Sequence, residues 1–176
     1  MMHMLTSLLL LGVVFLSANA FSSSSNWRNL DAFAAIMQDG SVTAWGSASA
    51  GAVVPTDLAN VHMIFSTEKA FTALLYDTTL RCWGNPLYGA DCARATFGVS
   101  GVITVCASSR AFAALKSNGD VVGWGDEAYG AVVPTGLTNV MTITSAAKAF
   151  AAILNDGSVR VWVSKKKCAG RAICPG

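Results

Sequence analysis

One short pattern occurs four times in this chain of 176 residues, and it constrains the fold more than any other feature. The copies read AFAAIMQDGSVTAWG (32–46), AFTALLYDTTLRCWG (70–84), AFAALKSNGDVVGWG (111–125) and AFAAILNDGSVRVWV (149–163). Phe and Trp are 12 residues apart in every copy, and successive copies start 38, 41 and 38 residues apart. A period near 40 residues is typical of repeat architectures, in which each repeat forms one small structural unit.

Each copy has the pattern of a β-hairpin. Two apolar stretches flank Asp-Gly or Asn-Gly in three copies, and these dipeptides suit a two-residue turn whose central residues have positive φ. The second copy has Asp77-Thr78 instead, and a β-branched Thr resists positive φ, so we expect that turn to be wider or strained. Helix is the competing interpretation because Ala favours helices. The turn interrupts each copy after about seven residues, however, which is short for a helix.

A second shared segment follows each hairpin. It reads AGAVVPTDLANVHMIFS (50–66) in the first copy and YGAVVPTGLTNVMTITS (129–145) in the third, while the second copy is three residues longer. The stretches NVHMIFS and NVMTITS alternate as half-buried strands do. The chain therefore divides into repeats at 32–69, 70–110, 111–148 and 149–163, each predicted to form a small antiparallel sheet.

Such a small sheet cannot bury its apolar face alone and needs a neighbouring copy stacked against it. Radial repetition of such sheets gives a β-propeller, and linear repetition gives a solenoid. We predict an all-β, β-propeller-like array of about four repeats, with three complete units and a terminal hairpin. This arrangement corresponds to a partial or open propeller.

The full cycle, AFAAL…DGxVxxWGxxxxGAxVPxxLxNVxxI, resembles the regulator-of-chromosome-condensation repeat superfamily over about residues 32–163. It is most similar to the short-repeat branch that includes secreted propeller-type inhibitors of β-lactamases. The resemblance implies a propeller that acts through protein–protein contacts, usually as a seven-bladed ring. This chain departs from that pattern in its repeat number and in Trp162-Val163, which replaces the usual Trp-Gly. A four-bladed or open array, a fragment of a longer gene product, or a ring completed by several chains would each account for the difference.

The chain start has the pattern of a secretory signal. The apolar run LLLLGVVFL (8–16) leads to Ala18-Asn19-Ala20, which predicts a signal peptide over residues 1–20. The alternative is an uncleaved anchor, but nine strongly apolar residues are short for a bilayer span of about 20, so we expect no stable membrane span after cleavage. Phe21 follows the expected cleavage point and precedes a Ser-rich stretch, which is similar to bipartite signals for complex plastids. Secretion is the first expectation and plastid import the second.

Residues 21–31 are expected to form a linker or an N-terminal strand, and residues 164–176 a basic tail. Four of the 12 basic residues lie in that tail, and the rest of the chain carries 8 basic and 10 acidic residues. Nucleic-acid binding would require a basic stripe along the body, so we expect no nucleic-acid partner.

The five cysteines predict disulfides more readily than a metal site. Their spacings match no zinc motif, and His62 is the one histidine after the signal. Cys82–Cys92 and Cys168–Cys174 are the candidate pairs, and buried thiols are the alternative. No pair of acids and no His-activated nucleophile is placed by the sequence for catalysis. We therefore expect neither an enzyme nor a cofactor.

The loops after Trp-Gly are the candidate binding surface. They read SASAG (47–51), NPLYG (85–89) and DEAYG (126–130), and equivalent loops of a propeller share one face. Their candidate contact residues are Tyr88, Tyr129, Asp126, Glu127 and Asn85, because tyrosines are common interface anchors and the polar groups add specificity. Ordinary solvent-facing turns are the alternative.

Two further sets of residues recur at fixed positions. Cations precede Ala-Phe in copies two to four, and a ring would bring them to one height where they could attract an acidic partner: Lys69, Arg110 and Lys148. Asp31 takes this place in copy one, and solvated strand ends are the alternative. The repeated tryptophans either pack between neighbouring blades or form a stacking surface for sugars.

These features favour a non-enzymatic module that binds another protein through loops on one face of the scaffold. A lectin-like or carbohydrate-active propeller that uses the tryptophans is one alternative. An exchange factor for a small GTPase is another, although the secretory start argues against it. Self-association that completes a ring is a further possibility.

Overall fold

The computed structural model describes residues 28–92 and 100–163. The expected signal peptide, residues 21–27 of the linker, the basic tail and the Cys168–Cys174 pair lie outside the described residues. Residues 28–31 lead into the first strand as irregular chain.

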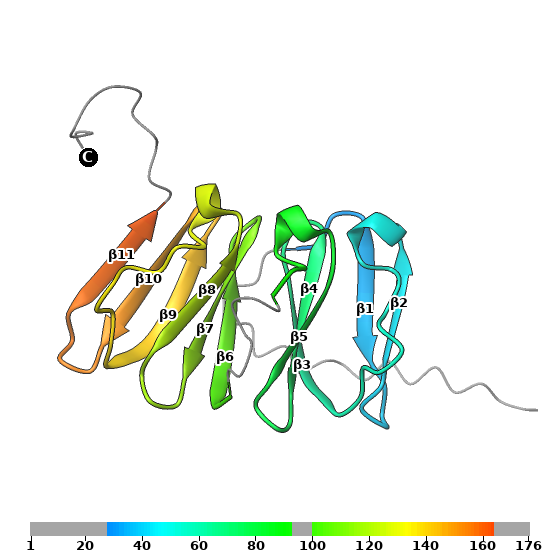
Figure 1. Ribbon diagram of the computed structural model, residues 1–176, viewed down its shortest axis with the longest axis horizontal. Coiled ribbons are helices and arrows are strands. Elements are labelled where there is room, and N and C mark those ends of the chain that lie inside the picture. Colours follow the sequence, from blue (N-terminus) through cyan, green and yellow to red (C-terminus); the bar gives the residue numbers. More distant parts are fainter. Residues whose placement is uncertain (1–27, 93–99, 164–176) are drawn as a thin grey trace, which may run out of the picture.

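Within these two ranges, eleven short strands form four antiparallel sheets. The first sheet contains β1 (Ala32–Ile36) and β2 (Val42–Gly46), and the second contains β3 (Val61–Ser66), β4 (Ala70–Leu75) and β5 (Leu80–Gly84). The third contains β6 (Val102–Ala107), β7 (Ala111–Lys116) and β8 (Val121–Gly125), and the fourth contains β9 (Val140–Ala146), β10 (Ala149–Leu154) and β11 (Val159–Val163). The sheets stand side by side in chain order along the longest axis of the molecule (Figure 1). The predicted all-β, propeller-like array of about four repeats is confirmed, and it is open.

The sheets are offset by one strand from the sequence repeats. β3, the last strand of the first repeat, pairs with β4 of the second repeat rather than with β1 or β2. The reason is chain length: three residues (67–69) join β3 to β4, whereas 14 residues (47–60) separate β2 from β3. The expected pairing within each repeat is therefore wrong, and the two-stranded sheet lies at the N-terminal end of the array.

The hairpin turns are longer than the expected two-residue type. The Gly40 N–H donates to the Met37 carbonyl (3.0 Å), and the Met37 N–H donates to the Ser41 carbonyl (2.8 Å). Of the pair Asp39-Gly40, only Gly40 has a positive φ, 78°. The Asp39 carboxylate accepts the Ser41 N–H instead. Thr78 replaces the glycine in the second copy and adopts φ 67°, so this turn is strained rather than wider.

Hydrogen bonds within the hairpin turns lower the pKa of three aspartate side chains. The pKa of each is held below its usual value by a hydrogen bond from the hydroxyl two residues on, and then by the backbone N–H of that residue: Asp39, Asp77 and Asp156.

Each Phe–Trp pair of the second, third and fourth sheets packs against a turn of the preceding sheet. Phe71 and Trp83 stack with their ring centroids 5.3 Å apart. The Trp83 indole N–H donates to the carbonyl of Gly51 (2.9 Å), and a Cβ on Gly51 would lie only 2.6 Å from the Phe71 ring. The Trp162 indole makes the equivalent bond to Gly130 (3.0 Å). The predicted packing of tryptophans between blades is confirmed for Trp83, Trp124 and Trp162 and is wrong for the exposed Trp45.

The hydrophobic core lies between sheets rather than within one sheet. Each of three buried clusters joins two neighbouring sheets. In the cluster between the first two sheets, Ala32 and Ile36 pack against Phe71 and Trp83. Burial of apolar surface is the main favourable term in folding. Each sheet is therefore stabilised by its neighbours.

Backbone hydrogen bonds also link successive sheets at equivalent positions. The Leu30 N–H donates to the Glu68 carbonyl (2.9 Å), the Glu68 N–H to Ser109 (3.0 Å), and the Ser109 N–H to Ala147 (3.1 Å). These four residues each lie two positions before a repeated Ala-Phe. We call this series the junction ladder, because it contributes one bond to each sheet–sheet junction.

The predicted Cys82–Cys92 disulfide is present, with Cα atoms 5.9 Å apart. It ties the chain after η2, the 3-10 turn at Pro86–Tyr88, to β5. Cys106 is buried, and its Sγ donates to the Ile143 carbonyl (3.3 Å) in the next sheet.

Within residues 28–92 and 100–163, no helix has the length and apolar character needed to cross a membrane. In the same described part of the chain, no group of three or more His, Cys, Asp and Glu side chains is arranged to hold a metal ion.

Two buried tryptophans provide a matched test of these junctions. The Trp83 N–H bonds to Gly51, whereas the buried Trp124 N–H has no acceptor within the described residues. Both Trp→Phe changes remove similar apolar area, so the hydrogen bond decides the difference. We expect Trp83→Phe to lower the free energy of unfolding by about 1 kcal/mol more than Trp124→Phe, as measured by urea denaturation. Equal losses in the two variants would contradict the assigned role of the Trp83–Gly51 bond.

Candidate functional site: a tyrosine–cation row

The candidate residues come from equivalent positions of successive sheets. Lys69, Arg110 and Lys148 each directly precede the middle strand of a sheet, at the starts of β4, β7 and β10. Tyr88 and Tyr129 end the 3-10 turns η2 and η3 (Glu127–Tyr129), which follow β5 and β8. Because the sheets stack in register, these positions share one edge of the array, the upper edge in Figure 1.

Cations and aromatic rings alternate along this edge. The Lys69 Nζ lies 5.9 Å from the centroid of the Tyr88 ring, and the Arg110 guanidinium carbon lies 4.8 Å from the same centroid. On its other side Arg110 is 4.8 Å from the Tyr129 centroid, and the Lys148 Nζ is 5.3 Å from that ring. We call Lys69, Tyr88, Arg110, Tyr129 and Lys148 the tyrosine–cation row.

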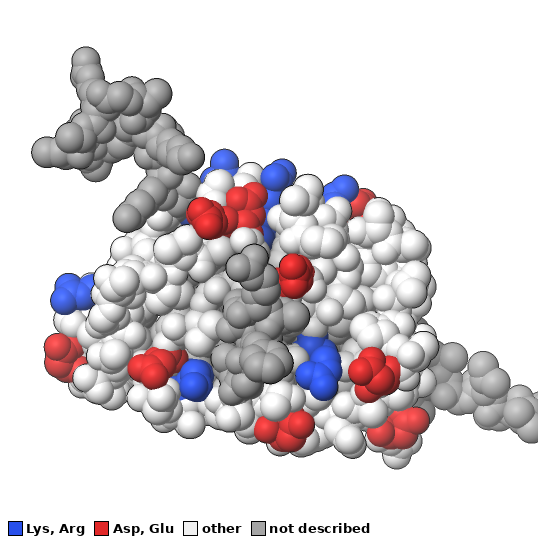
Figure 2. Space-filling view, in the orientation of Figure 1, with Lys and Arg blue, Asp and Glu red and all other residues white. Residues whose placement is uncertain are grey.

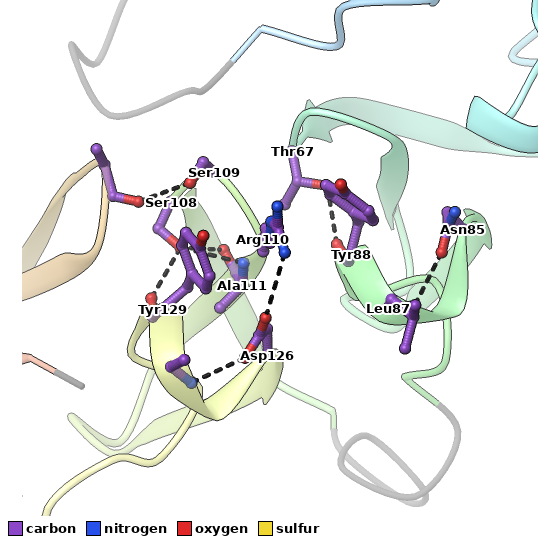
Figure 3. Close-up of polar contacts among 12 residues, drawn as sticks. Thr67, Asn85, Leu87, Tyr88, Ser108, Ser109, Arg110, Ala111, Asp126 and Tyr129 are labelled. Atoms are coloured by element: carbon purple, nitrogen blue, oxygen red, sulfur yellow. Dashed lines mark hydrogen bonds and ion pairs between the residues drawn. The ribbon is translucent and has the colours of Figure 1, made fainter. Parts of the chain in front are cut away.

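Arg110 occupies the centre of the row, between the two tyrosine rings (Figure 3). Its guanidinium also lies 3.9 Å from the Asp126 carboxylate, and its side chain is partly exposed. Contacts within about 6 Å of a ring centroid are attractive through the ring quadrupole. Two rings and a carboxylate therefore hold this cation in one position before any ligand arrives.

Hydroxyl groups anchor the two tyrosine turns. The Thr67 Oγ1 donates to the Tyr88 carbonyl (2.8 Å), and the Ser108 Oγ donates to the Tyr129 carbonyl (2.9 Å). Sequence reasoning missed both residues. The available signal was a Thr or Ser three positions before the repeated Ala-Phe, at the sharp bend between two strands.

Asn85 and Asp126, predicted as contact residues, act on their own turns. The side-chain amide oxygen of Asn85 accepts the Leu87 N–H (3.0 Å), and the Asp126 carboxylate accepts the Ala128 N–H (2.8 Å), as Figure 3 shows. Such caps satisfy backbone donors at the start of a turn. Glu127 is exposed on η3, so its carboxylate adds a negative group beside the row.

The row ends at the first sheet. There Asp31 takes the place of the cation and the buried Ala50 takes the place of the tyrosine, so Lys69 pairs directly with Asp31 (3.2 Å). Basic and acidic groups consequently lie close together along this edge, where Figure 2 shows blue and red side chains side by side at the top of the molecule. The two residue sets that the sequence predicted separately thus form one continuous surface.

The repeated tryptophans do not form a common platform. Trp83, Trp124 and Trp162 are buried between sheets, and only Trp45 of the four is exposed. Three of the four proposed sugar-stacking residues therefore present no face to a ligand.

The geometry of the row predicts unequal effects of two substitutions. Arg110→Gln removes two cation–aromatic contacts, whereas Lys148→Gln removes one. At about 0.5–1 kcal/mol per contact, we expect Arg110→Gln to lower the free energy of unfolding by about 1–2 kcal/mol and Lys148→Gln by roughly half as much. Urea denaturation measures both. A Lys148 effect as large as the Arg110 effect would show that Arg110 is not the centre of the row.

No protein-family model and no curated protein matches the chain. Solved structures do match its fold. Yeast RCC1 (Prp20) bound to Kap60 has a TM-score of 0.59 and 14% identity, over 78% of this chain and 42% of that one. The ectodomain of the Physcomitrella patens receptor kinase CR4 has a TM-score of 0.57 and 17% identity, over 77% of this chain and 39% of that one.

Human WBSCR16 matches with a TM-score of 0.54 and 21% identity, over 77% of this chain and 46% of that one. The chain thus spans less than half the length of these structures. At such identities the likeness concerns the fold alone. The protein has an RCC1-like β-propeller fold in the form of an open array of four sheets.

Proposed function

We propose that the protein is a non-enzymatic binding module that recognises another protein through the tyrosine–cation row and the adjacent Glu127. The observation that carries this proposal is the position of Arg110, fixed between Tyr88 and Tyr129 on a partly exposed edge. Tyr and Arg are, together with Trp, the residue types most enriched at the energetic centres of protein interfaces.

Two properties of the row favour a protein ligand. Its turns are held by the hydroxyls of Thr67 and Ser108, so binding immobilises few side chains and costs little entropy. Its charges also have both signs, since Asp126 and Glu127 lie on the turn that carries Tyr129. A surface of mixed sign complements a folded protein patch better than it complements a polyanion such as nucleic acid.

The fold and the cysteines are compatible with a secreted module of this kind. Yeast RCC1 (Prp20), whose fold this chain resembles, has binding properties toward Gsp1p and histones. The repeats of this chain also resemble those of the secreted inhibitor branch. The Cys82–Cys92 disulfide favours an oxidising compartment. We propose secretion as the location, with a complex plastid as the alternative that imaging of tagged residues 1–31 would identify.

A capture experiment with a matched control tests this function. The protein and its variants are immobilised and exposed to extracellular proteins of the source organism, and retained proteins are quantified by mass spectrometry. We expect one protein to be retained by the wild type and by Tyr76→Ala, which removes an exposed tyrosine outside the row. The Tyr129→Ala and Arg110→Gln variants should bind this protein at least about tenfold more weakly, because truncation of a hot-spot residue costs about 2 kcal/mol or more.

Other outcomes contradict the proposal. Equal retention by wild type and row variants would place the interface elsewhere. Binding of glycans alone, detected on a glycan array, would favour the lectin-like alternative. Acceleration of nucleotide exchange on a small GTPase would favour the exchange-factor alternative.

A further inference from the structure

The two end sheets expose the two halves of one kind of interface. Side chains alternate across each sheet, so Phe and Trp of a repeat point to one face and the neighbouring Ala and Ile point to the other. At the first junction, Phe71 and Trp83 of the second sheet pack against Ala32 and Ile36 of the first. The other two junctions have the same arrangement, with Leu74 and Leu115 at the position of Ile36. Every internal junction therefore joins the Phe–Trp face of one sheet to the aliphatic face of the sheet before it.

The first sheet leaves its Phe–Trp face uncovered. Phe33 and Trp45 stack with centroids 5.9 Å apart, yet their exposed fractions are 63% and 52%. Their equivalents in the other three sheets are buried. An exposed stacked aromatic pair at the end of an array is the type of apolar patch that marks an interaction surface.

The fourth sheet leaves the complementary face uncovered. Its exposed apolar residues include Ile153, Val159 and Val161, the last with 65% exposure. Ile36 and Val42, at the positions of Ile153 and Val159 in the first sheet, pack against the second sheet. The two ends lie at opposite sides of the molecule, at β1–β2 and at β11 (Figure 1).

Polar groups at the two ends match as well. The junction ladder runs from Leu30 to Ala147, so its next bond would join the Ala147 N–H to a Leu30 carbonyl. The edge residues at the same ends have opposite charge, Asp31 at the first sheet and Lys148 at the fourth. Within the chain, Asp31 already forms such an ion pair with Lys69 of the second sheet, at 3.2 Å.

We propose that two copies of this chain associate head to tail, with the Phe33–Trp45 face of each copy packed on the Ile153–Val161 face of the other. Both contacts are of the same kind, and an interface between unlike faces gives a ring where the rotation closes. Two copies together span about the length of one of the matched propeller structures, of which a single chain covers 39–46%. The resulting dimer is a closed ring of eight sheets.

Light scattering coupled to size-exclusion chromatography tests this assembly. The wild type should elute as a dimer, and Trp45→Arg or Val161→Arg should each give a monomer, because one blocked face disables both interfaces of a symmetric ring. Both side chains are exposed, so neither substitution disturbs the core, and circular dichroism checks the fold. Val132→Arg places the same charge on an exposed valine in the loop between η3 and β9 and should leave the dimer intact.

Mixing the two monomeric variants distinguishes head-to-tail pairing from other arrangements. Trp45→Arg retains an intact fourth-sheet face and Val161→Arg an intact first-sheet face, so an equal mixture should recover dimers joined by one interface. A monomeric wild type would overturn the proposal. It is the result expected if another part of the chain, rather than a second copy, covers the Phe33–Trp45 face. A series of larger species that grows with protein concentration would indicate an open filament rather than a closed ring. A dimeric Val161→Arg variant would indicate that two Phe33–Trp45 faces pair head to head. Both results contradict the proposal.

Discussion

The packing of a stacked Phe–Trp pair against the glycine turn of the preceding sheet is the interaction on which the rest of the structure depends. Phe71 lies so close to Gly51 that no side chain fits between them, and the Trp83 N–H bonds to the carbonyl of that glycine. A sheet of two or three short strands buries too little surface to be stable alone. The Phe–glycine contact recurs at each junction, and the indole hydrogen bond recurs at the junction between the third and fourth sheets. Together with the junction ladder, these contacts turn four marginal sheets into one folded unit.

The same stacking creates the candidate site. No single sheet contains the tyrosine–cation row, because Arg110 meets Tyr88 on the turn after the second sheet and Tyr129 on the turn after the third. The residues need only recur at equivalent positions, and the register of the array then places them along one edge. Binding residues on short turns of a rigid scaffold are a common arrangement in proteins. This scaffold leaves the turns free to vary while the Phe, Trp and Gly positions preserve the fold.

The sequence predicted those features that depend on local spacing: the hairpins, the open array, the inter-sheet packing of Trp83, Trp124 and Trp162, and the Cys82–Cys92 bond. It did not predict which strand partners which, because the repeat period is the same whether β3 joins the hairpin before it or after it. It also grouped the cations and tyrosines separately, since their contacts cross a sheet–sheet junction that no local pattern encodes. The sequence also did not predict the exposure of Phe33 and Trp45, because their copy of the repeat has the same pattern as the copies whose Phe and Trp are buried.

Mutual coverage of the sheets is the central claim, and native-state hydrogen exchange in increasing denaturant tests it most directly. Repeat arrays are held together by nearest-neighbour interfaces, and amides of a cooperative unit share one opening free energy. If the Phe–Trp contacts couple the sheets, the amides of β4 and β7 exchange through a single common opening. Separate opening free energies for β4 and β7, with each sheet exchanging independently of its neighbour, would contradict the account.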